Sequence, residues 1–200
     1  GRASRRTSSS YRKPDSLLVL KLGEGWGPPF EEILPLLLPD GRILVTAVDL
    51  IYMVGENGKV IWKYSPEGAP LNAQPVFRFD KNEIAFVGMD LTFERLNADT
   101  GQLIWHASAM GNGATYKDVR PFGDGYLVLV GMGGYRDRDA PDLPDKLEYW
   151  PVGIPDSAGW DVDFPIGANL IVSGKKIYAM QREKDSITLQ EVTPPSGPSN

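Results

Sequence analysis

The strongest constraint on the fold of this chain is a short pattern that occurs twice. Residues 54–62 read VGENGKVIW and residues 97–105 read NADTGQLIW, so a glycine is followed four positions later by a tryptophan in both. Gly58 and Gly101 are 43 residues apart, and Trp62 and Trp105 are also 43 residues apart. One step shared by both residue types indicates a structural repeat.

Apolar, strand-like runs follow nearly the same step. Ile84 and Leu127 are 43 residues apart, as are Leu127 and Leu170, whereas Ile43 precedes Ile84 by 41 residues. Four units therefore begin near residues 34, 75, 118 and 165. A period of about 40–50 residues that holds three or four short strands is typical of β-propeller blades, including WD40-like repeats.

The predicted fold class is all-β. Short runs of β-branched and large apolar residues, such as RILVTA, EIAFVG and YLVLVGM, alternate with turn-forming pairs such as Asn57-Gly58 and Asp124-Gly125. Several runs are apolar at consecutive positions, so we expect strands that are covered on both faces. Only FEEILPLLL has a hint of helix, and Pro35 interrupts it.

Three regions follow from composition. Residues 1–16 are basic and rich in serine, which is typical of a disordered tail or linker, and residues 193–200 form a second disordered tail rich in proline, glycine and serine. Residues 17–192 are predicted to form the propeller, with units near 34–66, 75–108, 118–152 and 165–192. The run SLLVLKL at 16–22 is interpreted as a strand given to another unit's sheet, which either closes the ring or marks a cut edge.

Composition also excludes several kinds of site. The chain has no cysteine, which excludes disulfides, thiolate metal sites and cysteine nucleophiles. His106 is the only histidine, and because it directly follows Trp105 we expect it to pack at a strand end. The net charge is −5 while basic residues gather in the first fifteen positions, so the acidic body is not expected to bind nucleic acid. No apolar run is long enough to span a membrane.

The second copy of the repeated pattern resembles a known motif. Arg95-x-Asn97-x-x-Thr100-Gly101-x-x-x-Trp105 is similar to the Ala-x-Asp-x-x-Thr-Gly-x-x-x-Trp tryptophan-docking repeat of quinoprotein-like (PQQ-type) β-propellers, and it departs from that repeat at the first position. The earlier copy keeps only the glycine and the tryptophan, with Asn57 in place of threonine. The third unit has KLEYWPVG without the Thr-Gly turn, and the fourth lacks the tryptophan.

The resemblance implies a quinoprotein-like propeller with about four antiparallel blades of three to four strands each. It also implies that each tryptophan ring wedges between neighbouring blades, where a large flat side chain buries much area. Glycine permits positive φ in the turn, and threonine or asparagine closes the turn by a local hydrogen bond. The residues with this structural role are Asn57, Gly58, Trp62, Asn97, Thr100, Gly101 and Trp105.

The third unit contains an insertion at 131–150, GMGGYRDRDAPDLPDKLEYW, which is the first candidate for a binding surface. Four acidic residues make a weak calcium candidate, because their spacing matches no standard calcium loop. These are Asp137, Asp139, Asp142 and Asp145. The candidates for ligand contact are Tyr135, Arg136, Arg138, Tyr149 and Trp150, together with Trp26 in the Gly/Pro-rich stretch GEGWGPPF.

Three functions are compatible with these observations. The favoured hypothesis is a non-catalytic binding or scaffold domain that presents a loop-lined face to a protein or a small ligand, without a catalytic residue or cofactor. The second is a quinone-dependent dehydrogenase, or part of one, for which the resemblance implies PQQ with calcium. The third is an extracytoplasmic sensory ligand-binding domain. Self-association or further blades from a longer chain would complete the ring, and the resemblance alone favours a periplasmic or secreted location.

Overall fold

The computed structural model describes residues 34–46, 50–66, 71, 73–88, 92–108, 114–132, 143–153 and 157–195. Within these ranges all regular structure is β, which confirms the predicted all-β class. The same ranges contain no helix that is long and apolar enough to cross a membrane. The predicted tail at 1–16, the run at 16–22, and Trp26 lie outside the described residues.

The strands form four antiparallel sheets, and in each sheet neighbours in space are neighbours in sequence. Sheet 1 comprises β1 (Leu36–Leu37), β2 (Ile43–Thr46), β3 (Ile51–Val54) and β4 (Val60–Tyr64). Sheet 2 comprises β5 (Val76–Arg78), β6 (Glu83–Val87), β7 (Thr92–Asn97) and β8 (Leu103–Ser108). Sheet 3 comprises β9 (Thr115–Phe122), β10 (Gly125–Gly131), β11 (Asp145–Pro151) and β12 (Trp160–Phe164). Sheet 4 comprises β13 (Asn169–Ser173), β14 (Lys176–Arg182) and β15 (Ile187–Val192).

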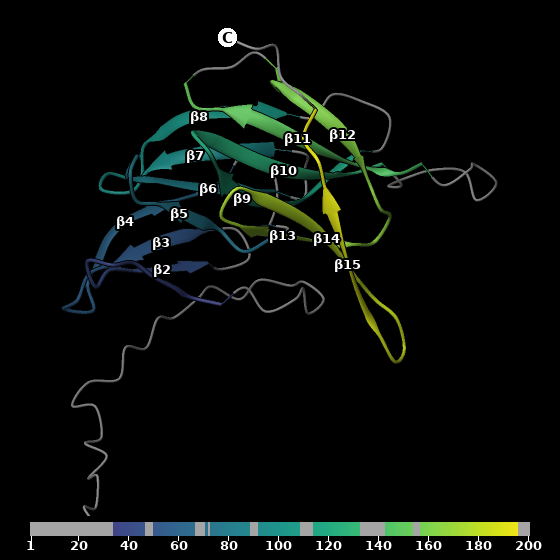
Figure 1. The fold of residues 1–200 in the computed structure, drawn as a ribbon. Helices are drawn as coiled ribbons and strands as arrows, with labels where there is room; N and C mark the ends of the chain where they lie inside the picture. The colour runs from purple at the N-terminus through teal and green to yellow at the C-terminus, as the bar shows by residue number, and fades with distance from the viewer. Residues whose placement is uncertain are drawn as a thin grey trace, which may run out of the picture.

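The consecutive apolar runs form the central strands, as predicted. Every residue of β6 and β10 is buried, because each strand has neighbours on both edges and a packed sheet on both faces. Apolar clusters fill the spaces between successive sheets. They include Leu44, Met53 and Ile84 between sheets 1 and 2, Phe93, Tyr126 and Val128 between sheets 2 and 3, and Leu127, Leu170 and Ile177 between sheets 3 and 4. In Figure 1 sheet 1 lies at the lower left, sheet 2 above it, and β15 on the right.

The turns between the first two strands of sheets 2, 3 and 4 meet at one end of the sheets. Phe79, Gly123 and Gly174, one residue from each turn, line a common groove. The turn between β7 and β8 lies at the same end, because the amide N–H of Ala98 donates to the carbonyl oxygen of Asn82 in the turn between β5 and β6. We call this end the turn face, and the opposite end the loop face.

The step of 43 residues predicts that Leu127 and Leu170 lie on equivalent strands, and this prediction is wrong. Leu127 lies on β10, the second strand of sheet 3, whereas Leu170 lies on β13, whose turn into β14 reaches the turn face as the β9–β10 turn does. Because β13 runs in the same sense as β9 and lies against it, β13 is a first strand. Residues 132–144 separate β10 from β11 and residues 152–159 separate β11 from β12. Both connections are longer than those of the second unit, so a step of 43 residues lands on the wrong strand. Sheet 4 therefore has a first, second and third strand but no fourth within the described ranges.

Candidate functional site

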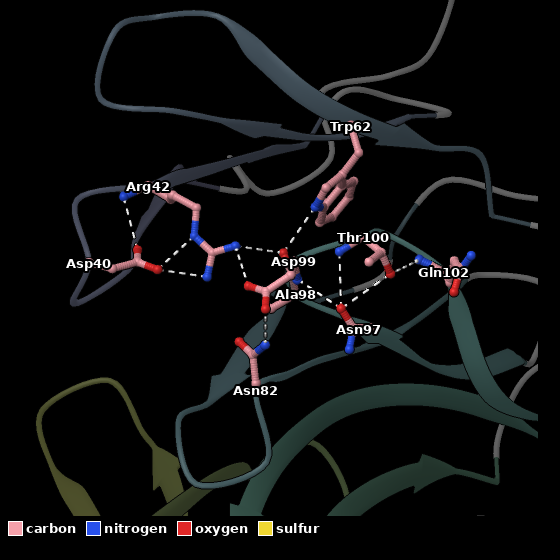
Figure 2. A network of polar contacts seen from close by, with 9 residues as sticks. All are labelled: Asp40, Arg42, Trp62, Asn82, Asn97, Ala98, Asp99, Thr100 and Gln102. Atoms are coloured by element: carbon pink, nitrogen blue, oxygen red, sulfur yellow. Dashed lines mark hydrogen bonds and ion pairs between the residues drawn. The ribbon is translucent and has the colours of Figure 1, made fainter.

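The repeated tryptophan of sheet 1 contacts the turn of sheet 2 (Figure 2). Trp62 lies on β4 and only 8% of its surface is exposed. Its indole N–H donates to the carbonyl oxygen of Ala98 at 2.9 Å. Gly101 has a φ of +68°, and a Cβ at this position would lie 2.6 Å from Cδ2 of Trp62. Glycine is therefore required here both for the turn conformation and for the close approach of the ring.

The turn that receives Trp62 is held by one asparagine. The Oδ1 atom of Asn97 accepts hydrogen bonds from the backbone N–H groups of Asp99 and Thr100, both at 3.0 Å, and from the hydroxyl of Thr100 at 3.2 Å. The Thr100 hydroxyl oxygen accepts from the N–H of Gln102. In the first copy, Asn57 accepts from the N–H of Lys59, and Gly58 has a φ of +74°. These local bonds fix the direction in which the Ala98 carbonyl points.

A cation, Arg42, completes the contact between sheets 1 and 2. The Nη1 atom of Arg42 donates to the Ala98 carbonyl at 2.9 Å and lies 2.9 Å from Asp99, while Asp40 binds the other side of the guanidinium. The hydrogen bonds from Arg42 lower the pKa of Asp40. The polar groups in Figure 2 are thus engaged with one another across two sheets, as expected for a structural joint.

The contact between sheets 2 and 3 is built differently. Trp105 on β8 is buried, and its ring centroid lies 5.3 Å from those of Phe93 and Trp150. The guanidinium of Arg95 lies over the Trp105 ring at 5.0 Å from its centroid. The third unit lacks the Thr-Gly turn, and in its place Trp150 supplies the surface on which Trp105 packs.

Arg95 is the most deeply buried charge of this contact, with 2% of its surface exposed. Its Nη1 atom lies 3.5 Å from Oε2 of Glu83, and its Nη2 atom donates to the carbonyl oxygen of Gly153. The hydroxyl of Tyr126 also donates to Glu83, at 3.1 Å, and burial raises the pKa of Tyr126. The Nε atom of Arg95 has no hydrogen-bond partner within the described ranges. Glu83, Arg95 and Tyr126 therefore form a buried charged cluster that joins sheets 2 and 3.

The described part of the predicted binding loop lies in a strand. Tyr149 and Trp150 belong to β11, and Trp150 is buried with its indole N–H on Glu148 at 2.9 Å. The prediction of a loop position is therefore wrong for both residues, because residues 145–151 pair with β10 and β12 inside sheet 3. The remaining candidates, Tyr135, Arg136, Arg138, Asp137, Asp139 and Asp142, lie outside the described residues.

Asp145, the described member of the weak calcium candidate, forms an ion pair. It is buried on β11, and Nζ of Lys117 lies 2.9 and 2.8 Å from its two carboxylate oxygens. No group of three or more histidine or acidic residues within the described ranges is arranged to hold a metal ion.

His106 also differs from the expectation. It lies within β8, opposite Glu94, and its side chain is exposed rather than packed. The strand alternates, so the residue after the buried Trp105 points to the other face, which is open to solvent.

A groove of about 410 Å³ lies at the turn face. It is lined by Phe77, Arg78, Phe79, Asp80, Pro121, Phe122, Gly123 and Gly174. Phe79 is 75% exposed at the tip of the β5–β6 turn, and its ring packs edge-on against Phe77, at 6.3 Å between centroids. An exposed aromatic ring beside a concave surface is a common contact for a protein partner.

The charged groups of the groove are already paired. Arg78 donates to the carbonyl oxygens of Gly125 at 2.6 Å and Gly123 at 2.8 Å, and its Nε atom lies 2.9 Å from Asp80. The hydrogen bond from Arg78 lowers the pKa of Asp80. The charges of Arg78 and Asp80 therefore balance, and the groove also presents the rings of Phe77, Phe79 and Phe122.

Aromatic rings continue from the groove along sheet 3. The ring of Phe122 packs edge-on against Tyr149 at 6.4 Å, and Tyr149 stacks on Trp160 at 5.5 Å with an angle of 13° between the rings. The Tyr149 hydroxyl donates to Asp124, which lowers the pKa of that carboxyl. The sequence predicts Tyr149 as a loop contact, whereas Phe79 and Phe122, two large apolar residues next to turns and one 43-residue step apart, were not among the predicted contacts.

Glu148 provides a test of the buried surroundings of Trp150. Burial raises the pKa of Glu148 above its ordinary value of 4.5, so the folded protein holds a proton more tightly than the unfolded chain. This contribution to stability is fully present below pH 4.5 and is lost as the pH rises through the raised pKa. We expect Glu148→Gln to be more stable than the parent at pH 7 and to lose that advantage at pH 4, as measured by urea unfolding. An advantage that is the same at both pH values would contradict this account.

The chain is similar to solved structures. No family model matches the chain, and no curated protein sequence matches it. The quinohemoprotein alcohol dehydrogenase from Comamonas testosteroni superposes with a TM-score of 0.52 and 17% identity over 64% of this chain and 20% of the dehydrogenase. The designed protein Ika8 gives a TM-score of 0.55 at 11% identity over 79% of this chain and 45% of its own. The WD40 domain of Neurospora crassa Pan2 gives a TM-score of 0.55 at 12% identity over 79% of this chain and 46% of its own.

These similarities confirm the predicted β-propeller fold, with the four sheets as its blades, and the solved structures that it resembles include both a quinohemoprotein dehydrogenase and a WD40 domain. The chain spans about a fifth of the alcohol dehydrogenase and less than half of the other two proteins. At these identities the similarity concerns the fold alone.

Proposed function

Because the chain has a quinoprotein-like β-propeller fold, we propose that it is a non-catalytic binding module that holds a protein partner at the turn face. The observation that carries this proposal is Phe79, which is 75% exposed beside a groove whose other walls include Phe77 and Phe122. Burying such a ring against a partner removes a large apolar area from water and gives a strong contact for few residues.

The distribution of charges supports the same function. Arg78, Glu83, Arg95 and Asp145 are buried, and each one bonds to a neighbouring strand or sheet. These ionisable groups therefore stabilise the packing of the sheets. What is left for contact at the turn face is an aromatic, nearly neutral surface, which suits an uncharged or apolar segment of a protein.

A selection from a random displayed-peptide library against the full chain tests this proposal. We expect enriched peptides that protect residues 77–80 and 121–123 from hydrogen exchange. Phe79→Ser should weaken their binding by about tenfold or more, since loss of an aromatic anchor costs more than about 1.4 kcal/mol. Ile61→Ser is the matched control: Ile61 is also an exposed large apolar residue, but it lies on β4, away from the groove, and its replacement should leave the peptide affinity unchanged.

Two results would contradict the proposal. Equal effects of Phe79→Ser and Ile61→Ser, or a footprint away from the turn face, would show that the groove is not the contact surface.

The second candidate function is a quinone-dependent dehydrogenase that holds PQQ with calcium, which the similarity to quinohemoprotein alcohol dehydrogenase favours. PQQ and calcium are added together to the protein. A shift in the thermal midpoint of unfolding, together with a change in the absorbance of the quinone, would support this enzyme instead of the binding module.

A further inference from the structure

The last strand of sheet 4 brings the chain to the turn face. Val192, the last residue of β15, lies opposite Ile177, close to the β13–β14 turn whose Gly174 lines the groove. β13, β14 and β15 lie side by side in this order (Figure 1), so β15 is about 10 Å from β13 at the usual strand spacing of about 4.8 Å. The residues that follow β15 therefore begin near the groove.

Side-chain packing also links the end of β15 to a wall of the groove. Val192 and Phe122 are both half-buried, and both pack against the apolar cluster between sheets 3 and 4. Phe122 also lines the groove. Beyond Val192, Pro194 is half-buried, whereas Thr193 and Pro195 are exposed. The chain therefore leaves sheet 4 beside the part of sheet 3 that contributes to the groove.

The sequence that follows β15 suits a groove lined by aromatic rings. Residues 193–200 read TPPSGPSN, with three prolines and no charged side chain. Proline-rich segments adopt the polyproline II helix, which has about three residues per turn, so Pro195 and Pro198 project from the same side of such a helix. Segments of the form Pro-x-x-Pro bind in aromatic-lined grooves, because the polyproline II helix is preformed and loses little conformational entropy on binding.

We propose that residues 193–200 bind in the turn-face groove of their own chain as a polyproline II segment, with Pro195 and Pro198 against its aromatic rings. Phe79 and Phe122 offer these rings from two different sheets. An uncharged segment also matches a groove in which the charges balance. This inference rests on the proposed function and deepens it, because it gives the class of partner: an uncharged Pro-x-x-Pro segment that competes with the chain's own.

The segment is long enough to reach across the groove. Eight residues of polyproline II span about 25 Å at about 3.1 Å per residue. The path from Val192 across two strands to the β13–β14 turn takes about 10 Å of this length. The remaining length enters the groove, which both Gly174 and Phe79 line.

Competition between the attached segment and a free copy of it tests the proposal. The probe is the synthetic peptide TPPSGPSN with both ends blocked, and its affinity is measured for the full chain and for Pro195→Ser with Pro198→Ser. The peptide should bind this variant about fivefold or more tightly than the parent, because an attached competitor acts at an effective concentration in the millimolar range. The matched control, Ser196→Ala with Ser199→Ala, keeps all three prolines and should bind the peptide as the parent does.

Equal affinity of the peptide for the parent and the proline variant would overturn the proposal, as would a lack of binding to either protein. The displayed-peptide selection tests the class of partner. Enriched peptides should carry Pro-x-x-Pro, and enrichment of sequences without proline would contradict the inference.

Disulfide trapping in the full chain tests where the segment lies, because the chain has no cysteine. Lys81→Cys, at an exposed position of the β5–β6 turn, is combined in turn with a cysteine at each position from 196 to 200. The matched control is Lys59→Cys, at an exposed position between β3 and β4 of sheet 1. A disulfide forms only where the two Cβ atoms lie about 3.5–4.5 Å apart, so cross-linking to position 81 should be about tenfold or more faster at one of the five positions.

The cross-linked product should be a monomer that forms at a rate independent of protein concentration. Disulfide-linked dimers would place the segment in the groove of a second copy and overturn the proposal, and so would equal rates for positions 59 and 81. The proposed function fails separately. If selected peptides protect residues 77–80 and 121–123 with equal affinity in the parent and the proline variant, only the inference about the segment fails. If they protect these residues in neither protein, the groove is not a contact surface.

Discussion

Glu83→Gln is expected to lower the free energy of unfolding by about 3–5 kcal/mol, because it leaves the guanidinium of Arg95 buried without its ionic partner. Arg95 is 2% exposed and Glu83 is the acidic side chain at 3.5 Å from it, so water cannot replace the lost charge. Chemical denaturation followed by tryptophan fluorescence measures the change, because Trp105 lies under the Arg95 guanidinium.

The double variant Glu83→Leu with Arg95→Met separates the cost of an unpaired charge from the value of the pair. Replacing both partners by apolar residues is expected to recover most of the loss, since it also removes the cost of burying two charges. Asp161→Asn is the exposed control: it removes one ion pair of Lys146 at 3.2 Å and should change stability by less than about 1 kcal/mol. A loss in the double variant as large as that in Glu83→Gln would show that the charges themselves stabilise this contact.

Trp62→Ala is expected to lower the free energy of unfolding by about 3–5 kcal/mol. It empties the space between β4 and the turn of sheet 2, and it leaves the Ala98 carbonyl without the indole N–H at 2.9 Å. Trp62→Phe keeps part of the apolar volume but loses the hydrogen bond, so its loss should be smaller. Urea unfolding of the parent, Trp62→Phe and Trp62→Ala measures the three free energies of unfolding, which should decrease in that order.

Gly101 tests whether the tryptophan ring and the turn act as one unit. Gly101→Ala places a Cβ at 2.6 Å from Cδ2 of Trp62 and at a φ of +68°, so it should destabilise the parent through both a clash and backbone strain. In the Trp62→Ala background only the strain remains, and the effect of Gly101→Ala should be smaller. Additive effects of the two substitutions would contradict a direct contact between the ring and the turn.

Local patterns were sufficient for much of the fold. The all-β class followed from short apolar runs between turn-forming pairs, and the positions of Gly58 and Gly101 in tight turns followed from the spacing of glycine and tryptophan. Both properties depend on a few neighbouring residues, since strand alternation and positive φ are decided within a short stretch of chain.

The candidate sites were less predictable because they combine side chains from separate hairpins. Phe79 and Phe122 are 43 residues apart, which is the step of the repeat, so they hold equivalent positions in sheets 2 and 3, but this step does not show that their turns line one groove. Trp150 was expected in a loop because the insertion at 131–150 has no internal pattern that marks where β11 begins.

What the sequence by itself determined is therefore the type of element and the repeat: short strands, their turns, and tryptophans at equivalent places in sheets 1 and 2. The tertiary structure alone decided that Arg95 is buried against Glu83, that β13 is a first strand, and that β15 is left as an edge. The physical reason is that strand and turn preferences arise from nearest neighbours along the chain. Burial, ion pairing and strand position arise from contacts between sheets, which no single stretch of sequence contains.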